Sequence, residues 1–173
     1  MRLRLLAAGA VVPLVCLAGH ASLATAAAAP TCHGHHATIV GTPGHDVLRG
    51  TAHADVIVAR GGADSVHAMR GADLVCAGAG ADHVSAGAGD DTVHGGGGDD
   101  VLKGNAAGDD LNGGAADDQL MGGNGNDDLK GSGGDDRLQG EKGDDRLMGG
   151  SGHDDATGGA GDDRCHGTCN DSL

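Results

Sequence analysis

The sequence predicts an all-β fold, a solenoid of fourteen nine-residue half-turns that form two parallel sheets packed face to face. Three observations support this prediction. A nine-residue pattern runs without interruption through most of the 173 residues. Each copy of the pattern places an aspartate and an aliphatic residue at fixed positions. The composition, with 36 glycines and no Phe, Trp or Tyr, lacks the large side chains that dominate most globular cores. Disordered Gly/Asp sequence would drift in phase, whereas an unbroken register indicates structural units.

The pattern starts at Gly41 and continues in rows of nine to His166 without insertion or deletion. We number the positions of each row one to nine. Position six is aspartate in all rows: Asp46, Asp55, Asp64, Asp73, Asp82, Asp91, Asp100, Asp109, Asp118, Asp127, Asp136, Asp145, Asp154 and Asp163. Position eight is Leu, Ile or Val in the first twelve rows and then Ala156 and Cys165. Position four is mostly Gly, and position one is always Gly or Ala.

Each row divides into a turn and a strand. Positions one to six carry turn residues, because glycine permits positive φ and close approach of the backbone. Positions seven to nine predict a three-residue strand whose middle side chain faces inward and whose neighbours face solvent. Two rows then make one full coil of eighteen residues, and successive coils stack through position eight.

The residues before the repeat are expected to direct export. A basic start at Arg2 and Arg4, an apolar run and a series of small residues make up the pattern of a secretory signal over residues 1–26, cleaved between residues 26 and 29. The alternative of a membrane anchor is disfavoured because the apolar run is shorter than the roughly 20 residues of a span. Cys16 would suit a lipoprotein, but the bulky Val15 before it argues against such processing. Residues 27–40 then form an N-terminal segment or cap, 41–166 the repeat and 167–173 a C-terminal tail.

The mature chain is strongly acidic. Without Arg2 and Arg4 it holds 9 basic and 25 acidic residues, a formal charge of −16. Such a charge argues against nucleic acid or anionic lipid as partners. Glu141 is the only glutamate, and this bias towards the shorter carboxylate indicates a geometric role close to the backbone.

The rows resemble a known repeat family. The segments Gly95–Lys103 and Gly122–Lys130 match the pattern GGxGxDxUx, where U is a large apolar residue, at every specified position. This is the nonapeptide of RTX, or haemolysin-type, calcium-binding repeats. The resemblance covers residues 41–166 and implies a parallel β-roll that holds Ca²⁺ between successive turns.

Calcium also follows from the residues. Position six places carboxylates along each edge of the stack, in coils about 4.8 Å apart, where bare charges repel. Ca²⁺ accepts six to eight oxygen ligands in flexible geometry, including backbone carbonyls, whereas Mg²⁺ demands a stricter arrangement. The resemblance implies that the fourteen position-six aspartates and main-chain carbonyls of the glycine turns are the ligands of multiple Ca²⁺ ions. Aspartates at positions five and seven are expected to be solvated charges.

The rows differ in their expected affinity for the metal. Twelve inward aliphatic side chains are too few to offset the entropy of ordering the repeat, so the metal-free chain is expected to be largely unfolded. Rows from Gly50 to Ser85 contain fewer glycines and predict a stabilised cap with weaker sites. Rows from Ala86 to His166 look like better calcium binders, apart from expected local weakening at Asn105-Ala106-Ala107 and at Ala115-Ala116.

Four cysteines remain after processing, and an even number in an exported chain favours disulfides. Three pairings are possible. Cys32–Cys76 and Cys165–Cys169 are preferred, because each would staple one end of the roll where strand edges need cover. The segment from Cys32 to Thr42 also resembles the N-terminal cap of secreted bacterial RTX-repeat proteins, which supports the first pairing.

A small histidine cluster lies beside the first cysteine. His33, His35 and His36 could capture Zn²⁺ or Cu²⁺, but a solvated N-terminal segment is the preferred interpretation.

Three functions are compatible with these patterns. The first is a secreted, extracellular, non-enzymatic protein that binds calcium ions and folds on binding them, as a monomer with no membrane span in its mature form. The second is a structural or adhesive surface or matrix protein with an unknown protein or glycan partner, although the outward positions show no uniform row. The third is a hydrolase, which the identical carboxylates disfavour because they offer no distinct acid and base. Residues 27–40 and 167–173 leave no room for a separate catalytic domain.

Overall fold

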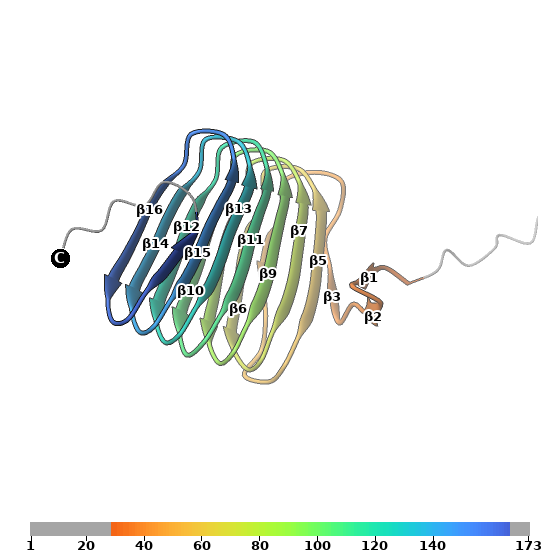
Figure 1. Cartoon of the computed structure of the whole chain (residues 1–173). Helices are drawn as coiled ribbons and strands as arrows, with labels where there is room; N and C mark the ends of the chain where they lie inside the picture. The colour runs from red at the N-terminus through yellow and green to blue at the C-terminus, as the bar shows by residue number, and fades with distance from the viewer. Residues whose placement is uncertain (1–28, 167–173) are drawn as a thin grey trace, which may run out of the picture.

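The computed structural model describes residues 29–166, which form a single stack of β-strand coils (Figure 1). Two parallel sheets face one another, and the chain passes from one sheet to the other after every strand. The described residues contain strands and turns and no helix. The all-β parallel solenoid predicted from the repeat is confirmed.

The strands alternate strictly between the sheets. The seven-stranded sheet contains β4 (Val47–Arg49), β6 (Ser65–Arg70), β8 (His83–Ala88), β10 (Val101–Ala106), β12 (Gln119–Asn124), β14 (Arg137–Lys142) and β16 (Asp155–Ala160). The eight-stranded sheet contains β3 (Ile39–Val40), β5 (Val56–Gly61), β7 (Leu74–Ala79), β9 (Thr92–Gly97), β11 (Asp110–Ala115), β13 (Asp128–Gly133), β15 (Arg146–Ser151) and β17 (Arg164–His166). Since β3 pairs with β5, the roll begins two residues before Gly41.

Every parallel pair has the eighteen-residue register expected from two rows per coil. Leu111, for example, is paired with Val93 in β9 and with Leu129 in β13. The prediction of three-residue strands is wrong, because most strands are six residues long. They include positions seven to nine and continue through positions one to three of the next row. The ladder leaves out position one and resumes at position two, as in the pairs Asn112–His94 and Gly114–Gly96 of β11 and β9.

The core is a single column of side chains between the sheets. Position eight is fully buried from Ile57 to Leu147, as predicted, while Leu48 and Cys165 pack against its two ends. Position one also faces inward, which the sequence reasoning did not recognise. Ala59 and Ala86 are among the alanines of this position that are completely buried. Two inward positions per row, one large and one small, therefore fill the narrow space between the sheets.

A short hairpin packs on the eight-stranded sheet near the N-terminal end of the stack. β1 (Thr31–Cys32) and β2 (His35–His36) pair in antiparallel fashion beside β5 and β7 (Figure 1). Cys32 is buried and forms a disulfide with Cys76 of β7, which confirms this predicted pairing. Cys165 lies in β17, but Cys169 is outside the described residues, so the second pairing stays a prediction. The expected signal (1–26) and tail (167–173) also lie outside them.

Candidate metal centre

The position-six aspartates form two buried ladders, one for each sheet. One ladder precedes the strands of the seven-stranded sheet and contains Asp46, Asp64, Asp82, Asp100, Asp118, Asp136 and Asp154. The other precedes the strands of the eight-stranded sheet and contains Asp55, Asp73, Asp91, Asp109, Asp127, Asp145 and Asp163. From Asp55 to Asp145 these residues are at most 6% exposed. Burial of so many carboxylates is costly unless each oxygen has a partner.

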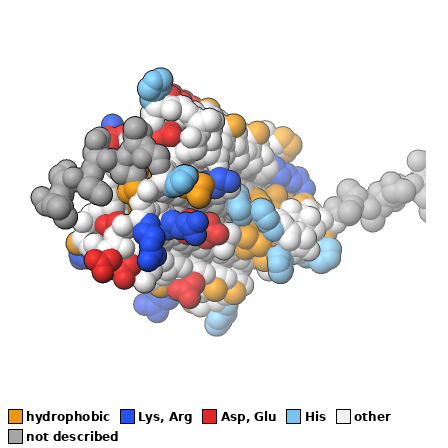
Figure 2. Space-filling view, in the orientation of Figure 1, with side chains coloured by type: hydrophobic (Ala, Val, Ile, Leu, Met, Phe, Trp, Pro, Cys, Tyr) orange, Lys and Arg blue, Asp and Glu red, His pale blue; other side chains and the backbone are white. Residues whose placement is uncertain are grey.

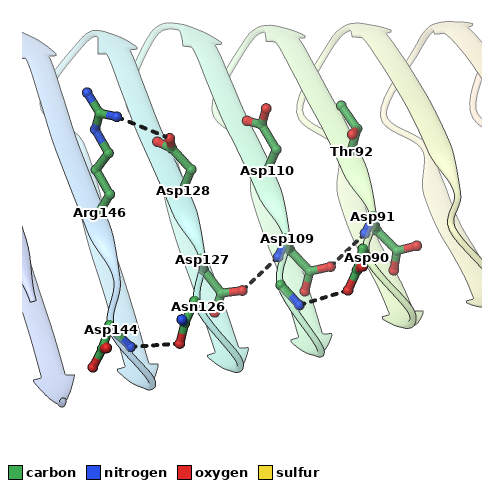
Figure 3. A pocket seen from close by; sticks show the side chains of 11 residues that line it. Asp90, Asp91, Thr92, Asp109, Asp110, Asn126, Asp127, Asp128, Asp144 and Arg146 are labelled. Carbon is green, nitrogen blue, oxygen red and sulfur yellow. Dashed lines mark hydrogen bonds and ion pairs between the residues drawn. The ribbon is translucent and has the colours of Figure 1, made fainter. Parts of the chain in front are cut away.

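One carboxylate oxygen of each rung has a partner in the protein. From Asp46 to Asp145, the backbone N–H of each position-six residue donates to Oδ1 of the position-six aspartate one coil further along, at 2.7–3.1 Å. Figure 3 shows this pattern from Asp91 to Asp109 and from Asp109 to Asp127. The ladder hydrogen bond fixes the direction of each side chain and stacks the carboxylates in register.

The second oxygen, Oδ2, has no hydrogen-bond donor through most of the stack. This holds for ten consecutive rows: Asp64, Asp73, Asp82, Asp91, Asp100, Asp109, Asp118, Asp127, Asp136 and Asp145. Buried acceptors without partners are rare in folded proteins, and a regular series of them points to a missing positively charged partner.

The buried carboxyls have raised pKa values. Burial, assisted by neighbouring carboxylates and opposed by the ladder hydrogen bond, raises the pKa of Asp100 and Asp109 to about 7. The same leading cause raises the pKa of Asp91, Asp118 and Asp127 to about 6. The largest shifts therefore occur in the middle of the stack, where rungs have neighbours on both sides. Without a cation, burial therefore shifts these groups towards the protonated form.

Unpaired carboxylate oxygens and carbonyl oxygens approach the backbone closely at position one. A Cβ added to Gly95, at position one, would lie 2.6 Å from the carbonyl oxygen of Gly113 and within contact distance of Asp100 Oδ2. Gly104 lies in the same way between Asp109 Oδ2 and the carbonyl of Gly122. A carboxylate oxygen and a carbonyl oxygen from the next coil thus converge where glycine leaves room. Oxygen donors of this kind are those that Ca²⁺ prefers.

The turns require glycine for two reasons. Positions two and four have positive φ in every row from Ala59 onwards, whether or not the residue is glycine. Each turn also lies directly on the turn of the preceding coil, so that a Cβ on Gly98 would stand 2.5 Å from the carbonyl oxygen of Gly80. Left-handed conformation and close backbone stacking together explain the glycines, and the sequence predicted both.

Position five forms a second, exposed ladder with the opposite direction. Asp117 Oδ1 accepts the backbone N–H of Asp135 at 2.8 Å, and Asp135 Oδ1 accepts that of His153 at 2.8 Å. Asn126 and Asp144 are linked in the same way on the other edge (Figure 3). These side chains are exposed, and their oxygens also hold successive turns together.

Position-seven aspartates are exposed as well. Asp128 and Asp155 face arginines of the next or preceding coil, in the pairs Arg146–Asp128 at 4.0 Å and Arg137–Asp155 at 3.9 Å. Exposed pairs of this kind contribute little to stability. Asp110 and Asp128, together with residues of positions five and six, line an acidic groove along the edge of β9, β11 and β13 (Figure 3).

The N-terminal histidines do not converge on a metal position. His33 stacks on His94 of β9, with ring centroids 4.0 Å apart, while His35 and His36 are exposed. Burial, and then the neighbouring His33, lowers the pKa of His94. Histidine side chains are visible around the hairpin end of the molecule (Figure 2). Within residues 29–166 there is no group of three or more His, Cys, Asp or Glu side chains that could hold a metal by themselves.

The candidate site is therefore built from one carboxylate per row and backbone oxygens. All fourteen predicted aspartates lie in the two ladders, and the structure brings them together as neighbours along the stack rather than as clusters. Sequence reasoning missed the unpaired Oδ2 and the role of position one. The invariant Gly or Ala at position one was the available signal.

Comparisons with known proteins agree with this geometry. No helix in the described part of the chain is long and apolar enough to cross a membrane. No curated protein matches the chain. The model of the RTX calcium-binding nonapeptide repeat matches in overlapping segments at residues 40–75, 68–102, 77–111, 94–129, 103–138, 121–156 and 130–165. With most of its length covered by these repeats, the chain belongs to the RTX calcium-binding nonapeptide repeat family.

Proposed function

We propose that this protein is a secreted, non-enzymatic calcium-binding protein whose roll folds when Ca²⁺ ions enter between stacked turns. The observation that carries the proposal is the series of buried Oδ2 atoms without a donor, repeated every nine residues from Asp64 to Asp145. A divalent cation would provide the partner that each of these oxygens lacks.

The ligands proposed for the ions are the position-six carboxylates from Asp64 to Asp163 and backbone carbonyls of the turns. When bound, Ca²⁺ would supply positive charge and bridge oxygens of successive coils. The chain's own residues orient the carboxylates for binding. The ladder hydrogen bond orients each carboxylate, and the small residue at position one, Gly or Ala, lets the chain pack closely beside it. Asp46 and Asp55 differ from the rungs that follow, because backbone N–H groups of the protein donate to their Oδ2 atoms.

The metal would also supply stability that the core lacks. The inward column consists of one aliphatic side chain and one Gly or Ala per row, without any aromatic residue. Such a column buries little apolar area for the number of residues that it orders. Binding energy at many sites would then be folding energy, because the sites do not exist in the unfolded chain.

The experiment is a calcium titration of the mature chain, residues 27–173, followed by isothermal calorimetry and far-UV circular dichroism. We expect a sheet spectrum and heat of binding with Ca²⁺, little of either with the same concentration of Mg²⁺, and loss of the spectrum in chelator. A sheet spectrum that persists in chelator, or the absence of any response to millimolar Ca²⁺, would contradict the proposal.

Export and the absence of catalysis are further parts of the proposal. The signal over residues 1–26 supports secretion, and N-terminal sequencing of the exported chain would test it, with a first residue between 27 and 30 expected. The ladders repeat one carboxylate environment many times, which supports a binding role rather than acid–base chemistry. We propose a monomer whose partners are calcium ions and not nucleic acid.

A further inference from the structure

The first two rows of the roll have a different turn from the twelve that follow. From Arg60 onwards, position two has positive φ in every row, but Thr42 and Thr51 at this position do not. Position four shows the same change, because Gly44 and His53 also lack positive φ. The first coil therefore has its own backbone conformation.

This conformation supplies donors to the carboxylate oxygen that is unpaired elsewhere. Thr42 donates its backbone N–H to Asp46 Oδ2 at 2.6 Å and its hydroxyl to the same atom at 2.9 Å. Thr51 donates to Asp55 Oδ2 in the same way, at 2.7 and 2.9 Å. A main-chain amide and a hydroxyl thus satisfy Oδ2 in both rows.

The threonine hydroxyls also fix the turn itself. Gly44 donates its N–H to Thr42 Oγ1, and His53 donates its N–H to Thr51 Oγ1, each at 3.2 Å. This side-chain turn is a local structure that Thr forms without any ion. β-Branched residues rarely adopt positive φ, so threonine at position two favours this turn over the positive-φ turn of the rows that follow.

The remaining oxygen of Asp55 is satisfied by the segment before the repeat. Thr38 donates its hydroxyl to Asp55 Oδ1 at 3.2 Å, and Val56 donates its N–H to Thr38 Oγ1 at 2.9 Å. Both oxygens of Asp55 therefore have protein donors. The hairpin and the Cys32–Cys76 disulfide lie at the same end of the stack.

We infer that Asp46 and Asp55 are structural acceptors rather than calcium ligands, and that the first coil is a metal-independent cap. This inference rests on the proposed function, because it divides the proposed sites into rows that take ions and rows that do not. A stack of coils needs an end that does not depend on a further neighbour. Thr42 and Thr51 provide that end, and the calcium-dependent rows begin at Asp64.

The first test compares two substitutions that remove the same charge from the full mature chain. In Asp127→Asn, the side-chain oxygen can still accept the ladder N–H of Asp109, but the oxygen proposed to face the ion is lost. Asp55→Asn is the matched variant in the cap. Bound Ca²⁺ per chain is counted by equilibrium dialysis. We expect D127N to bind at least one ion fewer than the wild type and D55N to bind the same number.

The second test uses only the wild type, so that a variant that fails to fold does not leave the question open. Hydrogen exchange followed by mass spectrometry is measured in chelator and in Ca²⁺. We expect residues 38–58 to remain more protected than residues 122–142 in chelator, and both segments to be protected in Ca²⁺. Equal exchange of the two segments in chelator would overturn the inference.

The outcomes separate this inference from the proposed function. If D55N loses as many ions as D127N, the inference is wrong while the calcium-binding function stands. If the wild type binds no Ca²⁺, the proposed function fails, and the protection of residues 38–58 in chelator still decides whether the cap exists.

Discussion

Loss of the Cys32–Cys76 disulfide should destabilise the calcium-loaded roll by about 4 kcal/mol. The bond closes a loop with a sequence separation of 44 residues. In the chain-entropy model, a loop of this length removes about 13 cal/mol/K from the denatured state, which is about 4 kcal/mol near room temperature. Alanine is the better replacement for the test, because Cys32 is 1% exposed and serine would bury a hydroxyl at that position.

The assay is urea unfolding of the Cys32→Ala/Cys76→Ala variant and the wild type at the same saturating Ca²⁺. With a slope of about 2 kcal/mol/M, the midpoint should fall by about 2 M. A loss smaller than about 1 kcal/mol would refute the reasoning and mean that the hairpin does not depend on its covalent link. Adding a reducing agent to the variant also tests Cys165–Cys169, since a further decrease is expected only if that bond forms.

Three further predictions concern the turns and the ladders. Ala116 has φ +82°, whereas its neighbour Ala115 does not have positive φ. Ala116→Gly should therefore raise the free energy of unfolding by about 1 kcal/mol, and Ala115→Gly should lower it slightly. Urea unfolding in Ca²⁺ measures both changes. Gly95→Ala should raise the Ca²⁺ midpoint of folding by crowding Asp100, whereas Gly97→Ala, whose Cβ meets nothing within 4 Å, should leave it unchanged. Equal effects would show that the close approach of Asp100 to position one does not matter for calcium binding. The third prediction concerns pH in the absence of metal. Burial raises the pKa of Asp100 from its ordinary value near 3.8 to about 7. Protonation of Asp100 therefore stabilises the metal-free roll. This contribution is complete below pH 3.8 and is lost as the pH rises to about 7. Circular dichroism of the dialysed, metal-free chain should therefore show more sheet near pH 4 than near pH 8, and the opposite order would contradict it.

The periodicity was sufficient to predict the architecture. An invariant aspartate and an aliphatic residue two positions later define which side chains face inward, and this determined the eighteen-residue coil and the burial of residues such as Leu111. The period also placed the fourteen aspartates in two rows. These features depend on geometry that every row repeats, so a single sequence reveals them.

The hydrogen bonds of the site could not be read from the same pattern. A period says which residues share a side of the chain, but not which backbone N–H each carboxylate oxygen meets. The ladder from Asp109 to Asp127 and the unpaired Oδ2 atoms depend on the stacking of one coil on the next. The sequence shows threonine at position two of the first two rows. Their hydrogen bonds to the aspartates could not be predicted, because these depend on the turn conformation of Thr42 and Thr51.

The N-terminal end of the roll carries the hairpin, the disulfide and the threonine turns, so unfolding should start from the opposite end. Each coil pairs only with the coils on either side of it, and near the N-terminal end the disulfide ties the hairpin to Cys76 of β7. Unfolding should thus begin at β16 and β17, at the C-terminal end, and proceed towards the N-terminus one coil at a time. The N-terminal coils would stay folded and keep the strand register from which the later coils can refold.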